Sequence, residues 1–112
     1  MPSPARNPLL RFHQAVAETL IALDVPDASE ARRADAIEFV LGQIAALPLH
    51  TATGVRAAAL TLMPGFERRD AAGRIAAIHK WERSKLPSTR LYLRLLRSLV
   101  LFAAYDTTWT LR

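Results

Sequence analysis

The segment Trp81-Glu82-Arg83-Ser84-Lys85-Leu86-Pro87 decides the fold prediction for this chain. A helical pattern runs up to the tryptophan and its basic neighbours. Leu86-Pro87 ends that pattern, because proline disfavours helical geometry in the residue before it. A second helical pattern starts at Pro87-Ser88 and continues to about residue 105. We therefore expect two helices joined by a short turn in the C-terminal half of the chain.

The helix expected over residues 90–105 combines a basic edge with a wide apolar surface. At about 100° per residue, Arg90, Arg94 and Arg97 fall within a sector of about 60°, which we call the arginine ridge. Apolar residues hold most other positions, and Leu101 continues the line of the ridge, so the last two turns are apolar all round. Such a helix is buried in its own domain or against a partner. It is either a core helix whose arginines reach solvent, or a docking helix that pairs with partner carboxylates or phosphates.

Three more helical patterns precede this pair, separated by proline and glycine breaks. Asn7 is the expected N-cap of the first, Asp27 or Ser29 of the second, and Asp70 of the fourth. The expected helices cover residues 8–24, from 27 or 29 to 48, about 51–63, from 70 to the segment at 81–87, and 87–105. Strand-like alternation and internal repeats are absent from the sequence. The prediction is one all-α domain over residues 1–112, a compact bundle of about five helices, with a short tail at 106–112 that is extended or partner-bound.

Charge is unevenly distributed along the chain. Residues 1–55 hold four Arg and six acids, a net of −2, whereas residues 56–112 hold eleven Lys or Arg and four acids, a net of +7. A basic half is typical of partners that are nucleic acids, anionic membranes or acidic proteins. The longest apolar run, residues 99–105, is far short of the roughly 20 residues that cross a bilayer, so no membrane span is expected. Because no secretory signal is visible, we expect a cytoplasmic protein, with export alongside a partner left open.

No group of residues in the sequence predicts catalysis. The chain has no cysteine, and its histidines, His13, His50 and His79, lie too far apart for a local metal motif. His13 lies beside an apolar stripe and is expected at the boundary of the core. The serines lack a G-x-S-x-G context, and the four glycines form no phosphate-binding loop. We therefore expect no catalytic, metal-binding or cofactor-binding residues and no enzyme that acts alone.

The two tryptophans differ in their expected roles. Trp81 has helical spacing from Ile78, which is more typical of a core residue, whereas Trp109 lies in a polar tail and is the better candidate for a contact with another surface. In the second helix, Arg32 is expected to face water with the other charged residues. The candidate partner interface comprises Trp81, Arg83, Arg90, Arg94, Arg97, Leu99, Phe102, Tyr105 and Trp109.

Three stretches together resemble a known kind of helical segment: residues 47–56, the run Ile78-His79-Lys80-Trp81-Glu82-Arg83-Ser84-Lys85-Leu86-Pro87, and residues 95–105. They are similar to the region before the FAD-binding domain in bacterial glucose-methanol-choline (GMC) family flavin oxidoreductases of the long-chain alcohol oxidase type. The chain is also similar in size and character to the small helical subunits of gluconate and sorbitol dehydrogenases. The resemblance covers roughly residues 47–109.

The resemblance implies a non-catalytic accessory subunit that docks on and stabilises a separately encoded FAD-dependent dehydrogenase or oxidase. The 112 residues contain no G-x-G-x-x-G motif, so FAD and substrate would belong to the larger partner. Two alternatives remain. One is a basic helical module that binds nucleic acid, which explains the charge but lacks a helix-turn-helix pattern. The other is a homo-oligomeric helical bundle.

Overall fold

Five α-helices make up most of residues 7–105, the part of the chain that the computed structural model describes. They are α1 (Pro8–Asp24), α2 (Glu30–Ala45), α3 (Leu49–Leu62), α4 (Ala71–Glu82) and α5 (Pro87–Tyr105). The described residues contain no strand, so the predicted all-α class is confirmed. α3 begins two residues earlier than predicted, because Pro48 ends the previous connection and is itself the N-cap residue of α3. The predicted tail at 106–112 lies outside the described residues.

Side-chain caps fix the starts of three helices. The Asn7 carboxamide oxygen accepts hydrogen bonds from two backbone N–H groups of the first turn of α1, at 3.0 and 3.3 Å. Ser29 caps α2 at 3.2 Å and Asp70 caps α4 at 2.8 Å. These caps satisfy donors that have no partner within the helix. The sequence left Asp27 and Ser29 open for α2, and the structure selects Ser29.

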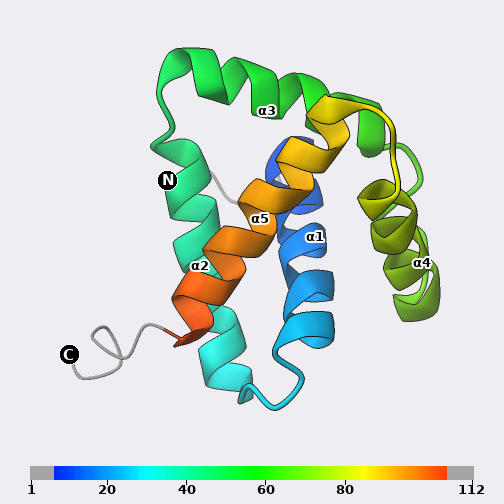
Figure 1. The fold of residues 1–112 in the computed structure, drawn as a ribbon. Coiled ribbons are helices and arrows are strands. Elements are labelled where there is room, and N and C mark those ends of the chain that lie inside the picture. Colours follow the sequence, from blue (N-terminus) through cyan, green and yellow to red (C-terminus); the bar gives the residue numbers. More distant parts are fainter. Residues whose placement is uncertain (1–6, 106–112) are drawn as a thin grey trace.

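The long helix α5 is the central element of the fold. It packs against each of the other four helices. Figure 1 shows it running diagonally across α1 and α2, with α3 across one end and α4 beside α1. Its 19 residues span about 28 Å, which is enough to reach all four neighbours. The residues that it buries are Thr89, Tyr92, Leu93, Leu96, Val100, Ala103 and Ala104.

An aromatic cluster joins α1 to the C-terminal half of the chain. Phe12 of α1 is fully buried and meets Phe66 edge-on, with ring centroids 5.5 Å apart. It also stacks on Tyr92 of α5 at 6.0 Å, and Trp81 stacks on Phe66 at 5.2 Å. Aromatic pairs at these separations contribute beyond their buried area. Trp81 is therefore a core residue, as its helical spacing from Ile78 predicted.

His13 forms a polar contact inside this core. The side chain is buried, and its Nδ1 lies 2.8 Å from the Tyr92 hydroxyl oxygen. Burial lowers the pKa of His13 from 6.5 to about 4, because an apolar surrounding disfavours the charged imidazolium. Burial also raises the pKa of Tyr92. Both groups are consequently neutral near pH 7, and the hydrogen bond ties α1 to α5.

Arg32 does not face water as the sequence predicted. Its Nε and Nη2 atoms donate hydrogen bonds to the backbone oxygen of Ala104, at 3.1 and 2.7 Å. The last carbonyl groups of a helix lack partners within that helix, and a cation near them also interacts favourably with the helix dipole. The prediction was wrong because only the packing of α2 against α5 brings this carbonyl within reach.

Candidate docking surface

One face of α5 is left uncovered by the other described helices. Leu91, Phe102 and Tyr105 are 60 %, 57 % and 64 % exposed, and Leu95 and Leu99 at the edge of the same face are half-buried. At about 100° per residue, all five lie within a sector of about 120°. We call these five residues the α5 strip. The last two turns of this helix, which were predicted to be apolar all round, thus have one buried face and one exposed apolar face.

A groove beside the strip lies between α5 and α3. It is a hollow of about 390 Å³. Gly54 and Ala58 of α3 are one helical turn apart, so small side chains leave room there, while Leu91 and Leu95 form the opposite wall. The complete lining is His50, Thr51, Gly54, Val55, Ala58, Ser88, Leu91, Tyr92 and Leu95. Leu91 and Leu95 belong to both the strip and the groove, which thus form one continuous surface.

The strip extends onto α2 at its other end. The rings of Phe39 and Phe102 stack with centroids 5.5 Å apart and an interplanar angle of 25°. Phe39 is half-buried, whereas Phe102 is more than half exposed. Sequence reasoning missed both this pair and the α3–α5 groove, because each combines residues from helices that are far apart in the chain.

The arginine ridge divides into two parts. Arg90 and Arg94 are exposed and make no ion pair with a described residue. Arg97 instead lies 2.8 Å from an Asp24 oxygen and 3.5 Å from a Glu82 oxygen. It therefore fastens α5 to the ends of α1 and α4. Only the first two arginines of the ridge are available to a partner without breaking an internal contact.

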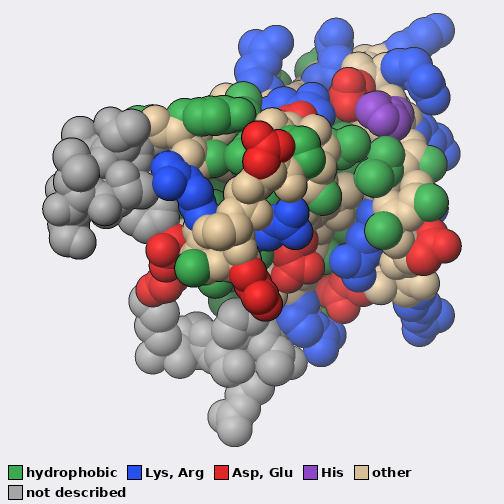
Figure 2. All heavy atoms as spheres, turned by 90° about the horizontal axis from the view of Figure 1, so that it is seen from below, with side chains coloured by type: hydrophobic (Ala, Val, Ile, Leu, Met, Phe, Trp, Pro, Cys, Tyr) green, Lys and Arg blue, Asp and Glu red, His purple; other side chains and the backbone are tan. Residues whose placement is uncertain are grey.

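The remaining predicted interface residues do not gather at one place. Trp81 is buried in the aromatic cluster, and Arg83 is exposed just after the last residue of α4. Leu99, Phe102 and Tyr105 belong to the α5 strip, and Trp109 lies outside the described residues. Figure 2 shows basic side chains around much of the edge of the face seen from below, with acidic side chains between some of them.

Comparison of the chain with protein-family models, curated proteins and solved structures gives no match. Over residues 7–105, no helix combines the length and apolar character needed to cross a membrane. The same residues hold no group of three or more His, Asp or Glu side chains placed to bind a metal ion. Function has therefore to be inferred from surface geometry.

Proposed function

We propose that this chain is a non-catalytic helical subunit that binds a larger protein through the α5 strip and the adjoining groove. The observation that carries the proposal is the exposure of Leu91, Phe102 and Tyr105 along one face of the central helix. Contiguous exposed apolar residues on a water-soluble domain mark sites of protein interaction. The flanking Arg90 and Arg94 match the enrichment of arginine in such interfaces.

The physical basis of binding is burial of apolar surface. Each Å² of apolar area removed from water contributes about 25 cal/mol before the costs of association. The groove beside Gly54 and Ala58 adds depth, so a partner side chain placed there would be desolvated on several sides. Arg90 and Arg94 supply orientation and speed of association more than affinity, because exposed charges are screened by solvent.

The partner that we propose is a separately encoded, FAD-dependent oxidoreductase of the GMC type. Support comes from the resemblance carried by residues 47–56, 78–87 and 95–105. These segments belong to α3, to the end of α4 with the following turn, and to α5, and α5 packs against both of the other helices. FAD, substrate and catalysis would all reside in the partner.

Affinity purification of the tagged protein from its native cells tests this proposal. Wild type should bring down a larger protein whose absorption spectrum is that of a flavoprotein. Leu91→Asp and Phe102→Asp should each remove that protein, because a carboxylate cannot be buried cheaply in an apolar contact. Leu60→Asp is the matched control, since Leu60 is 50 % exposed but does not line the groove or belong to the strip.

Three other outcomes would overturn the proposal. A colourless eluate rich in nucleic acid, which washes off steeply with salt, would favour the basic nucleic-acid-binding module. Elution of the pure chain at twice its mass or more on a sizing column, abolished by Phe102→Asp, would favour a homo-oligomer. Recovery of the flavoprotein at full occupancy with both Asp variants would show that the partner does not bind to the α5 strip.

A further inference from the structure

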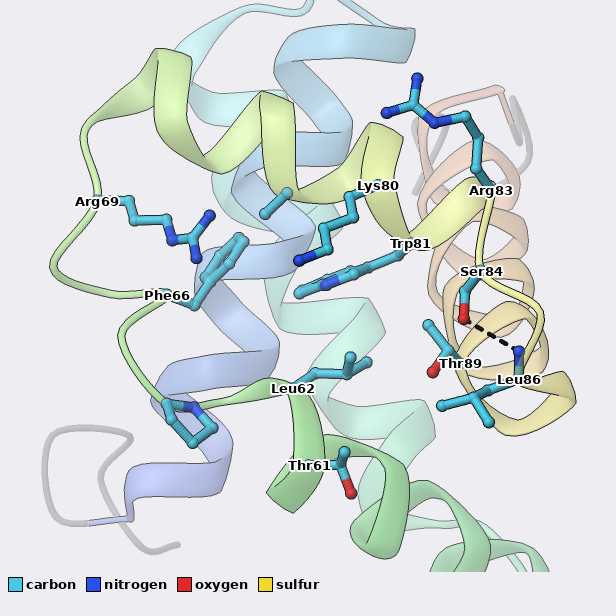
Figure 3. Close-up of a pocket in the computed structure, with 12 residues that line it drawn as sticks. Thr61, Leu62, Phe66, Arg69, Lys80, Trp81, Arg83, Ser84, Leu86 and Thr89 are labelled. Atoms are coloured by element: carbon cyan, nitrogen blue, oxygen red, sulfur yellow. Dashed lines mark hydrogen bonds between the residues drawn. The ribbon is translucent and has the colours of Figure 1, made fainter.

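A second cavity, which shares no lining residue with the groove between α3 and α5, carries an inference that is independent of the docking surface. It has a volume of about 480 Å³ and lies between the end of α3, the α3–α4 connection, α4 and the start of α5. Figure 3 shows the Phe66–Trp81 pair on one side of the cavity and Leu62 and Leu86 on another. Leu86 is 59 % exposed, so this wall is open to an incoming apolar group.

The charged side chains around this cavity all have the same sign. Arg69, Lys80 and Arg83 line it, and none of its lining residues is acidic. Figure 3 shows Arg69 and Lys80 reaching toward the Phe66–Trp81 pair from different sides. None of the three cations makes an ion pair with a described residue.

Two nearby acids, Asp70 and Glu67, form no ion pair with these cations. Asp70 accepts the capping hydrogen bond from the backbone of Gly73 at 2.8 Å. Glu67 lies 3.9 Å from Arg11. The cavity lining therefore carries three cations and no acid, and a basic concavity with apolar walls concentrates anions.

A hydroxyl group also lines the cavity. Thr89 is 4 % exposed as a whole residue, and its hydroxyl makes no hydrogen bond with a described residue. This hydroxyl is therefore available to hydrogen-bond with a ligand in the cavity.

We propose that this cavity binds a small amphiphilic organic anion, a carboxylate or phosphate monoester that carries an apolar body. Its anionic group would lie between Lys80 and Arg69, where charge-assisted hydrogen bonds are available. Its apolar body would rest between Leu62 and Leu86 on the edge of Trp81. The volume suits a small molecule, since ligand cavities run from roughly 300 to 1,000 Å³.

Tryptophan fluorescence offers a direct assay. The chain has two tryptophans, so Trp109→Phe leaves Trp81 at the cavity as the single reporter. Titration of this otherwise intact protein with octanoate and with octyl phosphate should give saturable changes in emission. Acetate and inorganic phosphate, which lack the apolar body, should compete weakly, and octyltrimethylammonium, which has the opposite charge, should not compete. Added salt should weaken binding of both octyl anions.

Matched substitutions locate the site. Lys80→Ala and Arg69→Ala should each weaken octanoate binding about five- to tenfold, the usual effect of losing one charge-assisted hydrogen bond. Lys85→Ala and Arg68→Ala remove neighbouring exposed charges that do not line the cavity, and should leave the affinity within about twofold. Circular dichroism confirms that each variant is folded.

Three results would overturn the proposal. The first is a fluorescence response that does not saturate. The second is equal binding of octyltrimethylammonium and octanoate, which would reduce the site to an apolar patch. The third is an equal loss of affinity in Lys85→Ala and Lys80→Ala, which would show that binding depends on the net charge of the protein and not on a defined site. None of these results bears on the docking proposal, because that depends on Leu91 and Phe102.

Discussion

Acid sensitivity of the core follows from the His13–Tyr92 hydrogen bond. Folding buries His13 as a neutral imidazole and lowers its pKa from 6.5 to about 4. The unfolded chain therefore takes up a proton on His13 as the pH falls through 6.5, whereas the folded chain resists it until about pH 4. A state that binds more protons is favoured by acid, so the free energy of unfolding must fall over this window.

The size of the effect follows from the two pKa values. Each pKa unit corresponds to about 1.4 kcal/mol, so the interval from 6.5 to about 4 represents about 3 kcal/mol between pH 7 and pH 4. Domains of this size are stable by roughly 5–15 kcal/mol, so the loss is a large part of the total. His13→Gln removes the titrating group and keeps a side-chain amide that can hydrogen-bond to Tyr92.

Urea denaturation at pH 7, 6, 5 and 4 measures this effect. The drop in the free energy of unfolding from pH 7 to pH 4 should be about 3 kcal/mol smaller in His13→Gln than in wild type, although the variant is less stable at pH 7. Comparison of the two proteins cancels the contribution of carboxylates. His50→Gln removes an exposed imidazole and serves as the control for the loss of a histidine. Parallel profiles for wild type and His13→Gln would refute the buried neutral imidazole.

Further substitutions at three places in the structure test the fold. Arg97→Ala should cost about 1–2 kcal/mol in urea denaturation, because it leaves Asp24 without its partner at 2.8 Å, and a double-mutant cycle with Asp24→Asn should recover a coupling of similar size. Leu96→Ala, at a fully buried position, should lower the free energy of unfolding by about 2–5 kcal/mol. Leu91→Ala on the exposed face should change it by less than about 0.5 kcal/mol. Equal costs would contradict the orientation of α5. Gly65 has a φ of 81°, which a residue with a Cβ atom disfavours, so Gly65→Ala should cost about 1 kcal/mol of stability and lower the thermal midpoint. An unchanged midpoint would show that the turn rearranges.

Local chemistry made the helices and their ends predictable. Asn7 and Asp70 cap helices because a short polar side chain reaches the free N–H groups of the first turn, an interaction that spans only two or three residues. The start of α3 was less predictable, because Pro48 can close one segment and open the next.

The candidate sites could be predicted only in part. The sequence showed that the helix after Pro87 is too apolar to be solvated on all sides, and it singled out Phe102 and Tyr105. It could not show which face of that helix remains exposed, because four other helices compete to cover it. The groove at Gly54 and the cavity at Thr89 both depend on residues from distant segments, so no local sequence pattern predicts them.

The sequence by itself determined an all-α chain, the positions of its breaks and the basic character of its C-terminal half. These properties depend on backbone preferences and composition, which act over a few residues. Only the tertiary structure decided that Arg97 is used internally while Arg94 is left exposed, and that Arg32 caps α5. Those outcomes depend on which helices meet, and contacts across 70 or more residues are set by packing of the whole core.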